Sequence, residues 1–285
     1  MTALVLLALS VVLMWPLPRL LARQHDWRRS PGAALVVWQL VSLSGVLAAL
    51  AAGPAAIPAL TGEGSNALLR TVVPVVAAAA SIVVLARLLR AGHVVGRRLR
   101  SLRREHRQLV DLIGVPDDTL GPGGRVLDHP TPTAYCLPGI RRRVVLSRGT
   151  LDQLQPDQLE AVLAHERAHL TRRHDLVIEF FTVLHTAAPA RVRSADALEE
   201  VRLLVEALAD RSAVRHVGSL PLAHALVALA SARSPEGGIA SNGASAAARL
   251  RLIDRPAPWW MPPVMYAFGA VTVALPVALL ALAWA

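Results

Sequence analysis

The chain contains no lysine, so all thirty of its basic side chains are arginines, and they give a net charge of +10 at pH 7. Aromatic residues make up only 4% of the 285 positions, which leaves little with which to stack nucleic-acid bases. The arginines cluster beside apolar segments instead of alternating with aromatic residues. We therefore expect no direct binding of nucleic acid and attribute the positive charge to membrane topology.

Cysteine is nearly absent as well. Cys136 is the only one, so the chain cannot form an internal disulfide, which fits a domain on the cytoplasmic side of a membrane. We interpret Cys136 as a small buried apolar residue, not as a metal ligand or a nucleophile.

Long apolar segments are what the chain has in abundance. Hydrophobic residues account for 54% of it and the mean hydropathy is +0.45, values that indicate membrane spans. Four segments are long enough to cross a bilayer: residues 1–21, 33–52, 68–89 and 256–285. The first has no basic residue at its start and no clear cleavage site after it, so we interpret it as a retained span and not as a signal peptide.

The arginines orient these spans. Four lie between residues 19 and 30 and eight between Arg87 and Arg107, whereas residues 53–70 carry only Glu63 and Arg70 as charges. By the positive-inside rule both arginine-rich segments are cytoplasmic. The sequence predicts a multi-pass protein of the plasma membrane with both termini outside. Its expected domains are three spans (1–90), a cytoplasmic domain (91–257) and a fourth span (258–285).

The cytoplasmic domain contains the segment LEAVLAHERAHLTRRHD, residues 159–175, with an H-E-x-x-H pattern from His165 to His169. Four residues advance a helix by slightly more than one turn, so the two histidines share a face and can bind one zinc ion. Glu166 then lies beside the open coordination position, where it can act as a base toward water. The alternative is a pair of surface histidines, but an accidental match in such a chain has odds of roughly one in a hundred.

A catalytic zinc usually takes three protein ligands, so the pattern needs a partner. Residues 199–213 read as a helix in which Glu206 and Asp210, four apart, share a face. We predict Glu206 as the third ligand and Asp210 as the acceptor for the distal nitrogen of a ligand histidine. Glu199 and Glu200 are rivals, but neither has an acid four residues later. A solvated acidic face is the other alternative, and the apolar residues around the pair argue against it.

The sequence offers four further residues as possible members of the site: His174, His216, His224 and Tyr135. His174 follows His165 by nine residues, which on a continuous helix turns it to the opposite face and removes it from the site. His216 and His224 are both candidates for stabilising a transition-state oxyanion, and no spacing chooses between them. Tyr135 lies in a short run predicted as an edge strand, where it could meet a peptide by strand addition or be an ordinary half-buried tyrosine.

HERAH at residues 165–169, followed by EALAD at residues 206–210, resembles the membrane-embedded gluzincins. These are the β-lactam sensor-transducers (BlaR/MecR-type) and the related HtpX/Ste-type proteases. Residues 132–154 and 172–175 also resemble segments found in these families. The resemblance covers most of the chain. It implies a mainly α membrane protein with a cytoplasmic α+β zincin-like (gluzincin) domain between spans three and four, and Zn²⁺ as cofactor. Because the chain ends at Ala285, we expect no penicillin-binding sensor domain, so β-lactam sensing is not implied.

The leading hypothesis is therefore an integral-membrane zinc endopeptidase that cleaves a protein substrate at the cytoplasmic side. The resemblance offers a DNA-binding repressor as that substrate, in regulated signalling. Two alternatives stay open: an HtpX-like quality-control protease, and a non-catalytic zinc-binding signal transducer. A protease site within the bilayer is disfavoured by the charges close to the motif, at Arg167, Arg172 and Asp175.

Overall fold

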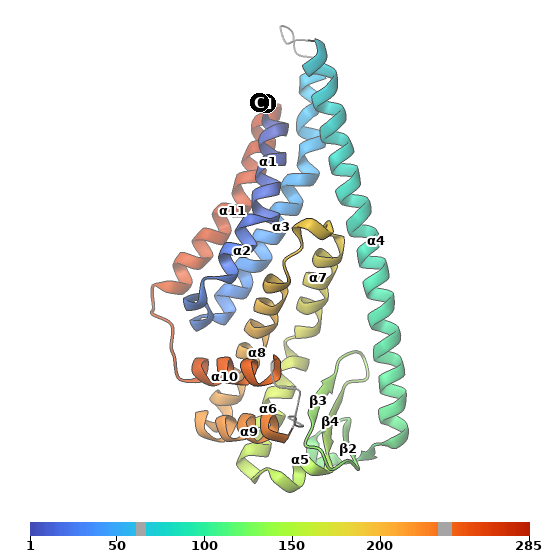
Figure 1. Cartoon of the computed structure of the whole chain (residues 1–285), viewed down its shortest axis with the longest axis vertical. Coiled ribbons are helices and arrows are strands. Elements are labelled where there is room, and N and C mark those ends of the chain that lie inside the picture. Colours follow the sequence, from blue (N-terminus) through green and yellow to red (C-terminus); the bar gives the residue numbers. More distant parts are fainter. Residues whose placement is uncertain (61–66, 233–240) are drawn as a thin grey trace. The chain divides into compact units, whose positions relative to one another are not determined.

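A computed structural model describes residues 1–60, 67–232 and 241–285 (Figure 1). Most of these residues are helical, and they form two compact units. The first unit comprises Met1–Val95, Phe181–Val201 and Ala257–Ala285, and the second comprises Gly96–Phe180 and Arg202–Pro256.

The described residues include four helices that are long and apolar enough to cross a membrane, the same number as the apolar segments predicted from the sequence. They are α1 with α2 (Thr2–Met14 and Pro16–Ala22), α3 (Pro31–Ala56), the greater part of α4 (Ala67–Ile113) and α11 (Met261–Trp284). These helices indicate a multi-pass membrane protein. The third is continuous with the helix predicted for the arginine-rich segment, so that α4 runs on to Ile113.

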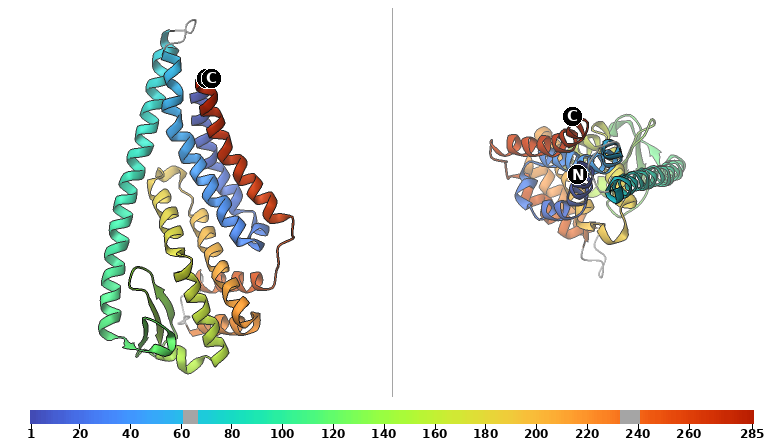
Figure 2. Two further views of the ribbon diagram at one scale, coloured as in Figure 1. Left: turned by 180° about the vertical axis from the view of Figure 1, so that it is seen from behind. Right: turned by 90° about the horizontal axis from the view of Figure 1, so that it is seen from above.

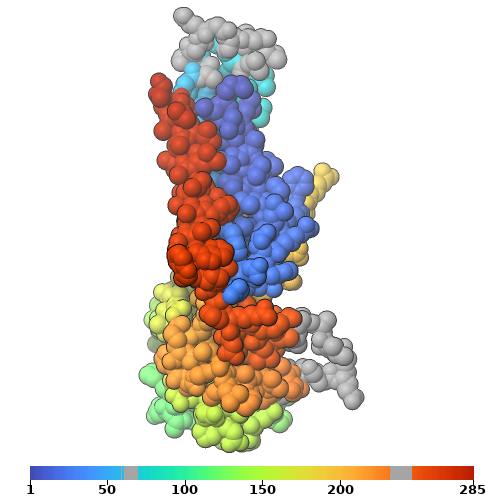
Figure 3. All heavy atoms as spheres, turned by 90° about the vertical axis from the view of Figure 1, so that its left-hand side faces the viewer, coloured from blue at the N-terminus to red at the C-terminus, as the bar shows by residue number. Residues whose placement is uncertain are grey.

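Small residues let the apolar helices approach one another closely. Helices α1 and α11 both pack along α3 (Figure 2), and the space-filling view shows α11 beside α1 (Figure 3). A side chain at Gly45 would meet Met14 Cγ at 2.7 Å, and the Ser10 hydroxyl donates to the Gly45 carbonyl at 2.9 Å. Ser81 of α4 similarly donates to Ala49 O of α3 at 2.7 Å. Close backbones and interhelical hydrogen bonds are the usual means by which membrane helices associate.

The segment Phe181–Val201, assigned from the sequence to the cytoplasmic domain, clusters with the apolar helices. Arg28, in the short 3-10 helix His25–Arg29, donates from Nε to Glu200 Oε1 at 2.9 Å, and the Glu200 side chain is only 6% exposed. Arg87 Nε donates to the Ala187 carbonyl at 2.7 Å. Glu200, one of the two rivals for the third ligand, is thus held by an arginine.

The second unit contains a small sheet with the strand order β1-β2-β4-β3. The strands are β1 (Val115–Pro116), β2 (Gly124–Leu127), β3 (Ala134–Leu137) and β4 (Arg143–Ser147). β2 runs parallel to β4, and β3 pairs antiparallel with β4 at one edge. The sequence predicts three of these strands, as short runs bounded by proline and glycine at residues 125–127, 134–137 and 143–147. The sequence also predicts that Gly114-Val115-Pro116 breaks the preceding helix, and α4 does end at Ile113. The structure adds that this segment pairs with β2, through Val115 opposite Val126.

Six helices complete the description of the second unit and its connections: α5 (Arg148–Gln153), α6 (Pro156–Thr171), α7 (His174–Ala187), α8 (Ala195–Val217), α9 (Ser219–Ala232) and α10 (Ser241–Ile253). Short 3-10 turns lie at Ile57–Leu60, Asp118–Leu120 and Ala190–Val192. The segment 234–247 is rich in glycine, serine and alanine, and the sequence predicts it as a mobile surface loop. It falls partly outside the described residues. From Ser241 onward that prediction is wrong, because the alanines there continue into α10.

The core of this unit forms where α6 packs on the sheet. Val162, Leu163 and Leu170 of α6 join Val144 and Leu146 of β4 in one buried cluster. Because these residues occupy the sheet side of α6, the helix presents a different side to α8.

A buried hydroxyl network fixes the strand ends to α5. Ser147 caps α5 and donates from its hydroxyl to Thr131 O at 2.8 Å, while the Thr150 hydroxyl donates to Thr133 O at 2.8 Å. Ser147 is 2% exposed and Thr150 is 0% exposed. The network therefore orders residues 131–133, which lead directly into β3.

We expect Thr150→Val to lower the free energy of unfolding by about 1 kcal/mol, because it preserves the side-chain shape but removes the buried hydrogen bonds of the Thr150 hydroxyl, while the backbone of Thr133 keeps its bonds to Ser147. Thermal unfolding of the detergent-solubilised chain measures the effect. Thr171→Val is the control, since Thr171 is exposed at the end of α6. Equal midpoints for the two variants would contradict the role of the network.

Candidate metal centre

The start of α6 is defined by local interactions. Gln155 is the N-cap and its backbone N–H donates to Gln158 Oε1 at 3.2 Å, while Pro156 occupies the first turn, where its missing N–H costs nothing. With this start and the apolar contacts on the sheet, His165 is buried and only 7% exposed. The helix register thus carries both histidines of the motif into the interior of the unit.

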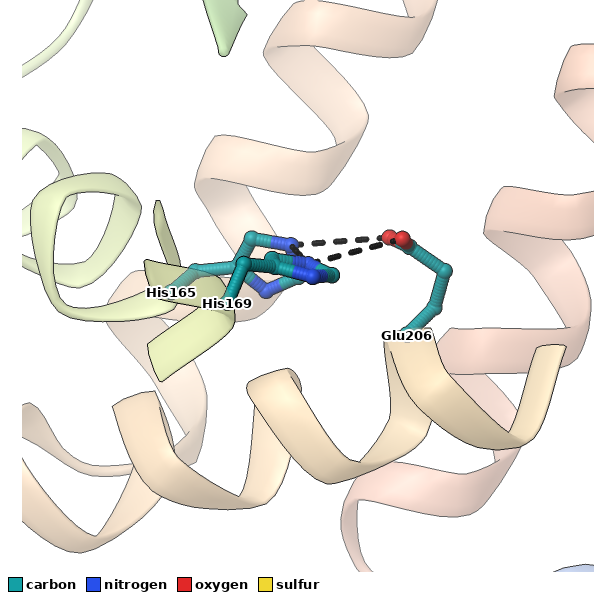
Figure 4. Close-up of side chains that lie close together, drawn as sticks. All are labelled: His165, His169 and Glu206. Carbon is teal, nitrogen blue, oxygen red and sulfur yellow. Dashed lines mark hydrogen bonds and ion pairs between the residues drawn. The ribbon is translucent and has the colours of Figure 1, made fainter. Parts of the chain in front are cut away.

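The two histidines meet Glu206 of α8, as Figure 4 shows. His165 Nε2 lies 3.1 Å from His169 Nε2, and each of these nitrogens lies 3.5 Å from a Glu206 carboxylate oxygen. A tetrahedral zinc with bonds of about 2.0–2.2 Å places neighbouring ligand atoms roughly 3.2–3.6 Å apart. The three residues therefore fit a zinc ion in both donor type and spacing.

Asp210 lies one turn after Glu206 on α8, on the far side of the first histidine. Its Oδ1 is 2.9 Å from His165 Nδ1, and the residue is 3% exposed. Since Nε2 of His165 faces His169 and Glu206, this contact leaves Nε2 to a metal and directs the ring. The structure places Asp210 where the sequence predicts it.

Arg249 of α10 is a member of the site that sequence reasoning misses. Its Nε donates to Asp210 Oδ2 at 2.8 Å and its Nη1 to Glu206 Oε2 at 3.1 Å, and its side chain is 14% exposed. It comes 39 residues after Asp210, so no spacing pointed to it. The sequence indicates such a residue only indirectly, because two acids in an apolar neighbourhood require a cation beside them.

His174 is the second residue missed, and the expectation that it faces away from the site is wrong. The helix does not continue through it: α6 ends at Thr171, Arg173 adopts a positive φ of 54°, and α7 begins at His174. The turn brings His174 Nδ1 to 3.1 Å from His169 Nδ1, with His174 only 3% exposed.

The structure does not bring the two candidate oxyanion histidines to the site. His216 and His224 are both exposed, and neither lines the cavity around the metal cluster. His216 Nδ1 instead lies 2.9 Å from Ser212 O in its own helix. Glu199, the remaining rival for the third ligand, is exposed.

The cavity has a volume of about 480 Å³. His165, Glu166, His169, Glu206 and Arg249 form its polar side. Residues 134–136 of the edge strand β3 form another wall. The apolar side comes from Val162 of α6, Ala246 of α10 and five residues of α9: Leu222, Ala225, Leu226, Leu229 and Ala230. An edge strand and a metal cluster therefore share one cavity.

Electrostatic balance within this cavity favours a cation. Burial opposes protonation of His165, but its hydrogen bonds to Asp210 and Glu206 raise its pKa to about 9. Burial also opposes ionisation of Glu206, yet the hydrogen bond from His165 and the charge of Arg249 lower the pKa of that carboxyl to about 2. Burial lowers the pKa of His169 to about 4, so this imidazole is neutral at pH 7 and able to ligate. A metal ion would compete with a proton at His165.

Glu166 and Cys136 lie together in the cavity. Burial raises the pKa of the Glu166 carboxyl, while the positive charge of His165 and a hydrogen bond from Cys136 act in the opposite direction. Burial and the nearby Glu166 raise the pKa of the Cys136 thiol. Cys136 is thus partly exposed to the cavity, but as a neutral thiol beside an acid.

Residues 97–236 match the family model of peptidase family M48. This segment includes His165, Glu166, His169 and Glu206, whereas Arg249 lies beyond its end. The M48 match supports a gluzincin metallopeptidase, and peptidases of family M48 are zinc-dependent. No curated protein and no solved structure matches the chain.

Removing the guanidinium of Arg249 should destabilise the protein. We expect Arg249→Leu to lower the free energy of unfolding by about 3 kcal/mol in the presence of a chelator, because the variant leaves the buried carboxylates of Glu206 and Asp210 with His165 as their remaining charged partner. Arg251→Leu changes an exposed arginine of the same helix and is the matched control. Thermal unfolding measures both, and an equal loss of stability in the control would contradict this role.

Proposed function

We propose that the chain is an integral-membrane zinc endopeptidase that hydrolyses peptide bonds of a protein substrate at the cytoplasmic side. The observation that carries the proposal is the spacing of His165, His169 and Glu206, whose ligand atoms all lie within 4.8 Å of one another. The M48 match and the four apolar helices support it independently.

In this mechanism His165 and His169 bind zinc through Nε2, and a Glu206 oxygen is the third ligand. Zinc held there would polarise the scissile carbonyl and lower the pKa of a water molecule. Glu166 accepts the proton of the attacking water and delivers it to the leaving amine. The raised pKa of Glu166 suits both steps, because it brings the carboxyl closer to neutral pH.

The edge strand β3 is the proposed binding site for the substrate backbone. It pairs with β4 on one side only within the sheet, and residues 134–136 line the cavity that holds the metal cluster. A peptide can extend a sheet by pairing with such an edge. The substrate would then cross the cavity in an extended conformation beside Glu166.

The arginine distribution supports the membrane orientation. With residues 19–30 and 87–107 inside, the metal-binding domain (91–257) is cytoplasmic and both termini are outside. Resemblance to the sensor-transducers favours signalling by cleavage of a DNA-binding repressor, whereas the resemblance to HtpX-type proteases favours quality control of membrane proteins. A repressor-like protein encoded beside this chain would favour signalling.

A structural zinc in a non-catalytic transducer would require a fourth protein ligand. Among the residues that the structure describes, the candidate cluster contains three. The three ligands leave one position for water, with Glu166 in the same cavity. This arrangement favours a catalytic zinc over a structural one.

Glu166→Gln should retain zinc and the fold but lose proteolysis by about 10²–10⁴-fold, since an amide cannot accept the proton. Cleavage is compared in cells carrying either form, and proteomics of the inactive form identifies trapped substrates. Glu160→Gln is the control on the same helix, where Glu160 is exposed. Undiminished cleavage by Glu166→Gln would rule out the mechanism.

Zinc should stabilise the chelator-treated chain, because a ligand that binds only the folded state raises the unfolding midpoint; the gain is about 2.7 kcal/mol at 100 times Kd. Glu206→Ala should remove most of this gain. Glu199→Ala, an exposed acid on the same helix, should keep it. If the two variants respond equally to zinc, Glu206 is not a ligand.

A further inference from the structure

The two ligand histidines are held in the same way from opposite sides. Both direct Nε2 toward Glu206, and both direct Nδ1 toward a second buried residue. For His165 that residue is Asp210, at 2.9 Å; for His169 it is His174, at 3.1 Å. Asp210 and His174 are equally buried, each 3% exposed. His174 has no role in the proposed mechanism.

We propose that His174 is a positioning residue for the zinc ligand His169, and that its Nδ1 accepts a hydrogen bond from the Nδ1–H of His169. This inference deepens the proposed function and rests on it. By accepting that proton, His174 holds His169 in the tautomer whose Nε2 lone pair is free for the metal, and it fixes the direction of the ring.

The direction of the hydrogen bond follows from the chemistry of imidazole. A neutral imidazole carries one N–H, so a histidine that binds a metal through Nε2 carries its proton on Nδ1. His169 is therefore the donor. His174 accepts with Nδ1 and carries its own proton on Nε2.

The chain places His174 by a turn that is otherwise unfavourable. Arg173 is the one non-glycine residue with positive φ among those described, and an arginine gains nothing from this conformation. Such conformations persist where the surrounding structure determines them. Arg103 of α4 supplies part of that structure, since it lies 3.3 Å from Glu179 and 3.6 Å from Asp175 in the first turns of α7. The position of His174 is thus fixed from its own helix as well as from His169.

A matched pair of variants separates hydrogen bonding from packing. His174→Asn and His174→Leu have nearly the same size, but only asparagine carries an acceptor near the position of Nδ1. His174→Phe is a second apolar variant that keeps the ring volume, in case leucine disturbs the fold. His224→Phe is the control for replacing a histidine, because His224 is exposed and does not line the cavity.

Zinc affinity of the full chain in detergent is measured by competition with a chromophoric chelator, and the visible spectrum of the Co²⁺ form reports the geometry at the metal. We expect His174→Leu and His174→Phe to bind zinc about 10–100-fold more weakly and to alter the Co²⁺ spectrum. His174→Asn should recover most of the affinity and the original spectrum. His224→Phe should match the unmodified chain.

Two results would overturn the inference alone: zinc binding by the leucine and phenylalanine variants as tight as that of the unmodified chain, or equal weakening in the asparagine and leucine variants. The second result would mean that His174 acts through packing. Failure of the unmodified chain to bind zinc would overturn the proposed function together with this inference. Tight zinc binding without peptide cleavage would overturn the proposed function only.

Discussion

The structure of the metal centre depends on two acids, Glu206 and Asp210, that lie one turn apart on α8 and face inward. A buried carboxylate without a partner is costly, and two of them on one face repel each other. Positively charged side chains must therefore lie beside these two carboxylates. His165 supplies a hydrogen bond to Asp210, and Arg249 contacts both acids. The requirement for charge compensation gathers α6, α8 and α10 at one point, which is also the point where a zinc ion fits.

The parts of this site that depend on local spacing could be predicted from the sequence. The two histidines of H-E-x-x-H share a helix face, as do Glu206 and Asp210, because four residues are close to one helical turn. Residues whose role depends on tertiary structure could not be found in this way. Arg249 reaches the acids only through the packing of α10, and His174 reaches His169 only because the chain turns at Arg173. A helical projection assumes that the helix continues. On that assumption it predicted, wrongly, that His174 lies on the face opposite His165.

The same distinction applies to the apolar helices. Their number could be predicted because hydropathy depends on composition over about twenty residues. The end of α4 at Ile113 could also be predicted, because Gly114-Val115-Pro116 breaks the helix. That the apolar span and the arginine-rich segment form one continuous helix could not, because hydropathy marks only the apolar part. Residues 181–201 are a second case. Their composition does not mark them as a span, yet the Arg28–Glu200 and Arg87–Ala187 contacts group them with the apolar helices.

Cys136 shows how the charge of the site also limits the number of metal ligands. It is the one cysteine of the chain, and it lines the same cavity as the two histidines. Zinc binds the thiolate and not the thiol, so a protonated Cys136 is a poor ligand. Burial and the adjacent carboxylate of Glu166 raise the pKa of this thiol and keep it protonated. Cys136 also lies outside the cluster of ligand atoms formed by His165, His169 and Glu206, so a zinc ion held by these three residues would keep a coordination position for water beside Glu166.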